Sequence, residues 1–212
     1  MKLRALFEQA SPISKAVAQQ IIDDCKPFFH EVIDIDENRL YRGLRLESFK
    51  RRAEEVAEGV YRAKVRKDRV PLNSPDYIHK YMDEWMEKEL GSKFRSGSIF
   101  CASERRTVLN FGNPFVILPI GNFTYAWSPF IEDVYSDVEE ISYAAEKAGD
   151  NSQETLDKIG EVLENAKYET TDLMRAMRDY PAHEIMVCCD EYYAFEPSVF
   201  TDYFYNYYKM LA

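Results

Sequence analysis

The 212-residue sequence has no long apolar run. A membrane-spanning helix needs about 20 consecutive apolar residues, and no stretch approaches that length. The first residues, Met1-Lys2-Leu3-Arg4, lead into polar sequence instead of the apolar segment of a secretory signal. We therefore expect a cytoplasmic protein that does not interact with a membrane.

Cysteine and histidine are scarce, and their spacing does not match a metal site. Cys188 and Cys189 are adjacent, and adjacent side chains on a strand point to opposite faces, which disfavours a shared site. The remaining cysteines, Cys25 and Cys101, are isolated, and the three histidines are widely separated. We predict buried, reduced thiols, histidines in ordinary polar roles and no metal.

The sequence also lacks a glycine-rich phosphate loop of the Walker or dinucleotide-binding type. A nucleotide would therefore have to be bound by a fold other than the doubly wound parallel sheet. Internal repeats and low-complexity tracts are absent as well, and only Ala148-Gly149-Asp150-Asn151-Ser152 is typical of a flexible surface loop. We expect one domain over residues 1–212.

Charge is distributed unevenly along a chain whose formal net charge is −10. Residues 39–69 hold 11 lysines and arginines against 5 acidic residues, whereas residues 131–212 hold 6 against 19. The acidic second half disfavours extended binding to duplex DNA, because phosphate neutralisation dominates such affinity. The basic segment suits a small anionic ligand, although Lys50-Arg51-Arg52 could equally be the solvated face of a helix.

Local patterns predict an α+β chain with a helical N-terminal part over 1–37, followed by a sheet built from the middle and the end of the chain. We expect helical segments within 2–24, beginning a second helix at Ser11 or Ser14, and further helices at 46–66, 76–90, 152–166 and 169–179. Strands are expected at 40–42, 98–103, 115–120, 184–189 and 191–195, with a helical turn at 104–110.

Two charged residues, Glu184 and Arg42, lie next to predicted strands, where they are candidates for a catalytic or binding role. Glu184 directly precedes the apolar run Ile185-Met186-Val187, which places a carboxylate at the mouth of a buried strand. A carboxylate held there can stabilise a developing positive charge such as a sugar oxocarbenium ion. Arg42 ends another strand and is followed by Gly43. The alternatives are a solvated rim for Glu184 and a structural ion pair for Arg42.

Together these segments resemble the Arg…Ser…Glu pattern of mono-ADP-ribosyltransferases, phage-encoded and toxin-like members in particular. The resemblance rests on Tyr41-Arg42-Gly43, on Ser98-Ile99-Phe100-Cys101-Ala102-Ser103 with Phe111 beyond it, and on Glu184-Ile185-Met186-Val187. It implies a split, mostly antiparallel β-sheet core over 38–196 and NAD as the substrate. A phage-encoded member would act in the host cytoplasm.

The resemblance also implies roles for individual residues. Arg42 would bind the phosphates of NAD, Gly43 would let the backbone approach the nicotinamide amide, and Tyr41 belongs to the same motif. Glu184 would accept a hydrogen bond from the nicotinamide-ribose hydroxyl, and Phe111 or Tyr125 would lie on the nicotinamide. The serine that orients the glutamate is Ser103, Ser98 or, by position, Cys101, and strand alternation favours Ser103.

The implied activity is transfer of ADP-ribose to a macromolecular acceptor, protein or nucleic acid, with release of nicotinamide. Arginine-modifying members carry a second glutamate two residues before the catalytic one, and this chain has Ala182 there. We therefore expect an acceptor other than arginine. The alternatives are an NAD glycohydrolase and a catalytically inert interaction protein with the same fold.

Overall fold

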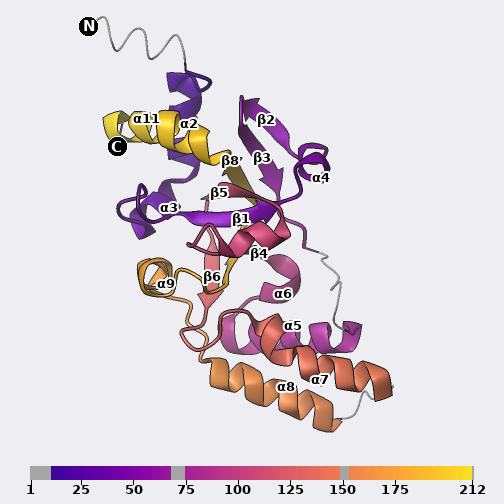
Figure 1. Cartoon of the computed structure of the whole chain (residues 1–212). Coiled ribbons are helices and arrows are strands. Elements are labelled where there is room, and N and C mark those ends of the chain that lie inside the picture. The colour runs from indigo at the N-terminus through magenta and orange to yellow at the C-terminus, as the bar shows by residue number, and fades with distance from the viewer. Residues whose placement is uncertain (1–10, 68–74, 149–152, 212) are drawn as a thin grey trace, which may run out of the picture. The chain divides into compact units, whose positions relative to one another are not determined.

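The computed structural model describes residues 11–67, 75–148 and 153–211, which form two compact units (Figure 1). Unit 1 comprises Met1–Lys64, Cys101–Phe123 and Cys189–Ala212, and unit 2 comprises Val65–Phe100 and Thr124–Cys188. The expectation that 1–212 is one domain stays a prediction. Each unit is built around its own sheet.

Unit 1 has a five-stranded sheet in the order β1-β5-β8-β3-β2, and every neighbouring pair is antiparallel. The central strand β8 and its neighbour β5 are apolar along most of their length and are buried there. The strands are β1 (Leu40–Leu44), β2 (Glu54–Ala57), β3 (Val60–Lys64), β5 (Asn113–Ile120) and β8 (Glu191–Phe195).

Helices at both ends of the chain complete unit 1. Ser14 caps the N-terminus of α2 (Lys15–Asp24), where its hydroxyl accepts a hydrogen bond from the Val17 amide. The C-terminal helix α11 (Tyr205–Leu211) packs beside α2 (Figure 1). The unit also has α3 (Lys26–Glu31), α4 (Leu46–Lys50), the 3₁₀ helix η1 (Thr107–Phe111), α10 (Pro197–Val199) and the π-helical η2 (Phe200–Phe204).

Unit 2 has a three-stranded sheet in the order β4-β7-β6, in which β6 and β7 are antiparallel. The strands are β4 (Ile99–Cys101), β6 (Thr124–Trp127) and β7 (Ile185–Cys188). The helices are α5 (Asp76–Leu90), α6 (Phe94–Gly97), α7 (Val134–Ala148), α8 (Gln153–Ala166) and α9 (Leu173–Asp179).

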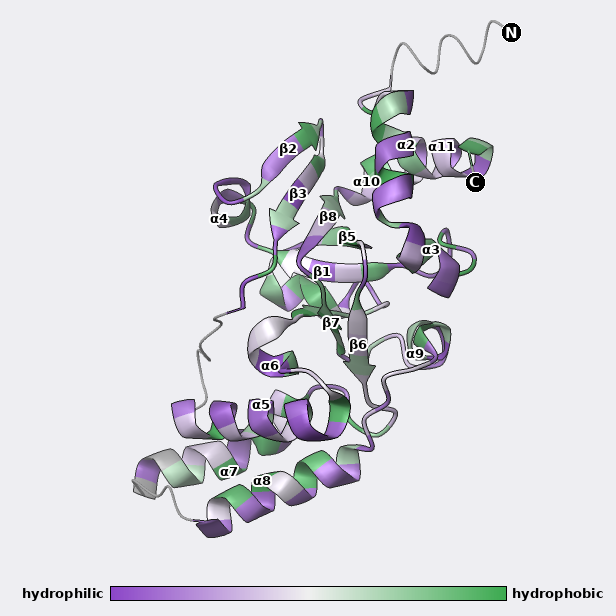
Figure 2. Cartoon of the chain, turned by 180° about the vertical axis from the view of Figure 1, so that it is seen from behind, coloured by the Kyte–Doolittle hydropathy of each residue, from purple (hydrophilic) through white to green (hydrophobic). Residues whose placement is uncertain are grey.

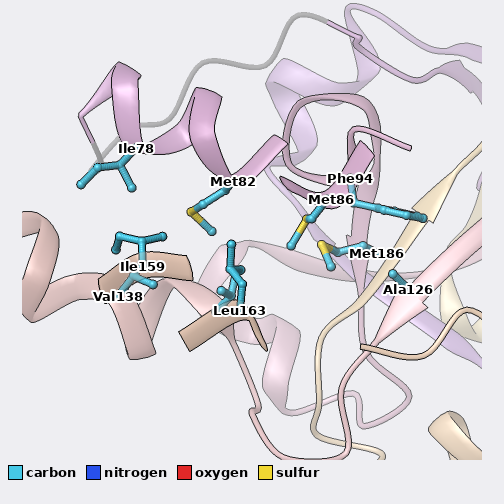
Figure 3. Close-up of a cluster of buried hydrophobic side chains, with 10 residues drawn as sticks. Ile78, Met82, Met86, Phe94, Ala126, Val138, Ile159, Leu163 and Met186 are labelled. Carbon is cyan, nitrogen blue, oxygen red and sulfur yellow. The ribbon is translucent and has the colours of Figure 1, made fainter. Parts of the chain in front are cut away.

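The core of unit 2 joins its helices to its sheet. Met82 and Met86 of α5 lie with Phe94 of α6, Leu163 of α8 and Met186 of β7 in one buried apolar cluster (Figure 3). Hydrophilic and hydrophobic bands follow each other along α5 and α8, as expected of helices that bury one face (Figure 2). This packing places β7 against α6.

The α+β class with antiparallel sheets is confirmed, and most expected strands are present. Of the two starts proposed for the early helix, Ser14 is the cap. The helix predicted over 46–66 is wrong, because only α4 is helical and a β2–β3 hairpin follows. Gly59 adopts φ +72° at its turn, a left-handed conformation that ends a helix and suits a hairpin.

Other differences lie in elements that sequence patterns did not indicate. Helix α7, strand β6 and the C-terminal helices had no assignment, and α9 begins at Leu173 instead of 169. The later start follows from a backbone bridge between Glu169 and Trp127, which holds Glu169 extended. The expected loop at 149–152 and the first part of the helical segment, 2–10, lie outside the described residues.

Within the described residues no helix is both long and apolar enough to span a membrane. All four cysteines are free thiols; three are buried and Cys188, at the end of β7, is half-buried. Burial raises the pKa of Cys188 to about 11. The Cys188 side chain is therefore a thiol, and a poor nucleophile, at neutral pH.

We expect Cys188 in the folded protein to react with iodoacetamide about a hundredfold more slowly at pH 8 than in the unfolded chain. The reason is that a rise of about two pKa units lowers the thiolate fraction by that factor. Stability should fall as pH rises from about 9 towards 11, because the unfolded chain then loses the proton first. Tandem mass spectrometry distinguishes Cys188 from Cys189; equal labelling of folded and unfolded protein would contradict the assignment.

Candidate functional site

Glu184 lies directly before β7, where the sequence placed it. Its side chain is half-buried, and its backbone amide donates a hydrogen bond to the Glu132 carbonyl oxygen at 2.7 Å. The turn at 181–183 precedes it, with the His183 amide bonded to the Tyr180 carbonyl oxygen. Because three of the four β7 residues are fully buried, the Glu184 backbone starts a rigid strand.

Arg95 of α6 forms an ion pair with Glu184. Its Nη1 atom lies 2.9 Å from Glu184 Oε1, and the two side chains are only 12% and 16% exposed. The guanidinium also stacks over the Phe100 ring, 4.5 Å from its centroid, and Nη1 lies 3.9 Å from the Met186 sulfur. Three neighbouring groups therefore define the position of this guanidinium.

Asp83 of α5 holds the backbone of α6 in turn. Its Oδ1 atom accepts hydrogen bonds from the amides of Arg95, at 2.9 Å, and Ser96, at 3.1 Å. Asp83 is buried, and His79 lies one turn before it with Nε2 3.7 Å from Oδ2. A charged helix-capping interaction thus fixes the residue that pairs with Glu184.

A shallow hollow lies beside Glu184 within unit 2. Ser128 is one of its polar lining residues, but its hydroxyl is used internally, donating to Ala166 and accepting from two backbone amides. The other lining residues are Ile131, Glu132, Val134, Tyr168 and Glu184. The hollow encloses no space that a water molecule could fill, so it is not a ligand cavity in this structure.

Two ionisable groups near Glu184, Tyr168 and Asp137, have raised pKa values. Burial raises the pKa of the Tyr168 phenol far above its usual value, and the Glu184 carboxylate raises it further. Burial and Asp133 also raise the pKa of Asp137. Tyr168 is consequently a neutral phenol at physiological pH, able to donate a hydrogen bond.

The strand with the serine motif, β4, is the neighbour of β7 in the three-stranded sheet. Ser98 lies just before β4 in unit 2; it is fully buried, and its hydroxyl donates to the carbonyl of Phe94, the first residue of α6. Cys101, at the end of β4, is buried and Ser103 is half-buried, and both belong to unit 1. Of the two candidate serines, Ser98 therefore shares a unit with Glu184.

Arg42 is half-buried in β1 of unit 1, opposite Phe115 of β5. The preceding residue, Tyr41, exchanges two backbone hydrogen bonds with Ala102, at 2.7 and 3.0 Å. Burial raises the pKa of Tyr192, and the positive charge of Arg42 opposes part of that rise. The arginine motif thus lies beside the segment that follows the serine-motif strand.

Gly43 lies in close contact with the 3₁₀ helix η1 and the residue after it. A Cβ added there would lie 2.2 Å from the Val108 carbonyl oxygen and 2.9 Å from the Phe111 Cβ. Gly112 has the same relation to β1, since its added Cβ would lie 2.5 Å from the Leu44 carbonyl carbon. The two glycines let η1 rest on β1, and the Phe111 ring is 63% exposed.

The residues missed by sequence reasoning are Arg95, Glu132 and Tyr168. Arg95 and Glu184 are 89 positions apart, and no spacing rule connects them. The described residues contain no group of three or more His, Cys, Asp or Glu side chains that could hold a metal ion. His183 has an ordinary polar role, its Nδ1 lying 2.7 Å from the Ser128 carbonyl oxygen.

Comparisons with family models, with curated proteins and with solved structures give no match. The activity of this chain has to be inferred from the chemistry of these residues.

Proposed function

We propose that the chain transfers ADP-ribose from NAD to a macromolecular acceptor, with the core of an ADP-ribosyltransferase. The observation that supports this most directly is the adjacency of β4 and β7. Ser98 directly precedes β4 and Glu184, with its half-buried side chain, directly precedes β7, so the two motif residues stand next to neighbouring strands of one sheet. The motifs require neighbouring strands, and sequence spacing alone does not produce them.

In the proposed reaction the bond between C1′ of the ribose and the nicotinamide nitrogen breaks, and its electron pair leaves with neutral nicotinamide. The ribose becomes an oxocarbenium ion, and the negative charge of Glu184 stabilises it. The acceptor then attacks C1′ and loses a proton. Arg42 would hold the phosphates, since a guanidinium matches phosphate oxygens in two hydrogen bonds.

The alternative of a catalytically inert protein is favoured by one observation, the ion pair of Glu184 with Arg95. A carboxylate whose negative charge is already balanced by an arginine stabilises an oxocarbenium ion less than an unpaired carboxylate does. An NAD glycohydrolase would differ from the transferase only in using water as acceptor.

Incubation with labelled NAD, with and without a cell extract, separates the three possibilities. A transferase labels an extract component and releases nicotinamide, a glycohydrolase releases nicotinamide without labelling anything, and an inert protein does neither. Identification of the labelled species by mass spectrometry would name the acceptor as protein or nucleic acid.

Arg42→Ala is expected to weaken NAD binding by at least about tenfold more than Arg45→Ala, the scale of one charge-assisted hydrogen-bonding pair. Arg42 is half-buried within β1, whereas Arg45 is exposed before α4, so only Arg42 has a fixed position. Isothermal titration calorimetry of both variants tests this. Equal losses would point to a diffuse basic surface instead of a positioned arginine.

Arginine side chains are expected to be poor acceptors. A guanidinium is protonated at neutral pH and needs a carboxylate to orient it and assist proton removal. Ala182 occupies the corresponding position, in a turn that precedes β7. Agmatine supplied with NAD should remain unlabelled in mass spectra. Rapid labelling that Glu132→Gln abolishes would show that Glu132, across the hollow, supplies the carboxylate instead.

A further inference from the structure

We propose that Arg95 is a positioning residue for Glu184, and that its ion pair holds the carboxylate in place for cleavage of NAD instead of disabling it. This inference rests on the proposed function. Arg95 belongs to none of the three motifs identified in the sequence. It comes from α6, a four-residue helix whose place is determined by α5.

The contacts of Arg95 hold its guanidinium against one carboxylate oxygen of Glu184. Asp83 fixes the amides of Arg95 and Ser96, so the backbone that carries the guanidinium cannot drift. The Phe100 ring lies under the guanidinium plane, 4.5 Å from Cζ, and Nη1 meets Glu184 Oε1 at 2.9 Å. Both backbone and side chain of Arg95 are therefore constrained before any ligand binds.

Glu184 needs such a support because its own side chain has three rotatable bonds. The adjacent β7 is rigid, but it restrains only the backbone of the residue before it. A carboxylate that must face one ribose carbon loses efficiency when it samples other rotamers, because catalytic stabilisation depends on groups oriented in advance. A guanidinium fork supplies directional hydrogen bonds, which a lysine ammonium does not.

A second pair in unit 2 provides a matched control. Arg175 Nη1 lies 3.0 Å from Glu169 Oε2, and its guanidinium stacks over the Trp127 ring at 5.3 Å. This pair has the same chemistry, an arginine between a carboxylate and an aromatic ring. Its carboxylate, Glu169, is absent from the lining of the hollow.

The test compares nicotinamide release by Arg95→Ala, Arg95→Lys and Arg175→Ala with that of the unchanged protein. We expect Arg95→Ala to lower kcat about a hundredfold, the scale of a misplaced catalytic group. Arg95→Lys keeps the charge and the fold, and should lower kcat at least about tenfold while KM stays within about twofold. Millimolar ethylguanidinium should restore much of the activity of Arg95→Ala. Arg175→Ala should match the unchanged protein and should not respond to ethylguanidinium.

Activity of Arg95→Lys and Arg95→Ala close to that of the unchanged protein would overturn the proposal, as would a loss that Arg175→Ala shares and ethylguanidinium fails to restore. Higher activity of Arg95→Ala would overturn it in the other direction and identify the ion pair as inhibitory.

If the unchanged protein releases no nicotinamide, the proposed function fails by itself. Side-chain NMR of Glu184 then decides the structural part, because Arg95 contacts the carboxylate and not the backbone. Averaging over several Glu184 rotamers only in Arg95→Ala supports positioning, and the same rotamer distribution in all variants refutes it.

Discussion

Glu184→Gln is expected to reduce nicotinamide release by at least about a hundredfold, which corresponds to about 2.7 kcal/mol of activation free energy. The amide keeps the shape of the side chain but loses the charge that opposes the oxocarbenium ion. NAD binding should change little, because the lost interaction forms mainly in the transition state. Steady-state kinetics with calorimetry of NAD binding measures both quantities.

The ion pair with Arg95 adds a second effect to this substitution. Glutamine leaves the Arg95 guanidinium without a compensating charge in a site where both side chains are mostly buried. We expect a stability loss of about 1–3 kcal/mol, because an amide oxygen can still accept one hydrogen bond. Release must therefore be measured well below the unfolding temperature of the variant.

Glu169→Gln is the matched control for Glu184→Gln. Its pair with Arg175 is also an arginine–carboxylate pair in unit 2, but a more exposed one. It should lose little stability and no activity. Nicotinamide release by Glu184→Gln within about tenfold of the unchanged protein would remove Glu184 from the proposed mechanism.

Gly43→Ala is expected to destabilise unit 1 by about 1–3 kcal/mol or more, the scale of forced overpacking. The added methyl group would lie 2.2 Å from the Val108 carbonyl oxygen, a backbone atom that cannot rotate away. The η1 segment would have to move off β1 to relieve the contact. Thermal and denaturant unfolding monitored by circular dichroism measures the loss.

Gly97→Ala serves as the control, because a Cβ at Gly97 meets no heavy atom within 4 Å. Its effect on stability should stay within about 0.5 kcal/mol. If Gly43→Ala proved as stable as Gly97→Ala but lost NAD binding, the glycine would serve the ligand and not the packing of η1. The two outcomes separate the role implied by the family resemblance from the role that the contacts indicate.

Elements with a strong local signal were predicted well from the sequence. Helix α5 carries the apolar spacing of an amphipathic helix and ends at Gly91, which adopts φ +83° as a C-terminal cap. Strand β5 is a continuous apolar run and is buried as expected. The β2–β3 hairpin was mistaken for a helix because its alternation is short and its charged residues also suit a helix surface.

The candidate site also contains one residue that the sequence predicted and others that it did not. Glu184 at the start of a buried strand follows from local order, since a charged residue before an apolar run marks the strand end. Its partner Arg95 does not, because ion pairs between distant segments depend on how α6 docks on the sheet. The proximity of Glu132 likewise depends on a backbone hydrogen bond between residues 52 positions apart.

The sequence by itself determined the α+β class, the positions of the buried strands and the place of Glu184 before one of them. Arg42, which was expected at the end of a strand, lies in the middle of β1. Hydrophobic periodicity and turn residues act within a few positions, so they are visible in the order of residues. Only the tertiary structure decided that β4 lies beside β7, that Arg95 pairs with Glu184 and that the space above Gly43 is filled by η1. These contacts join segments far apart in the chain, and their formation depends on the packing of a whole unit, which no local pattern encodes.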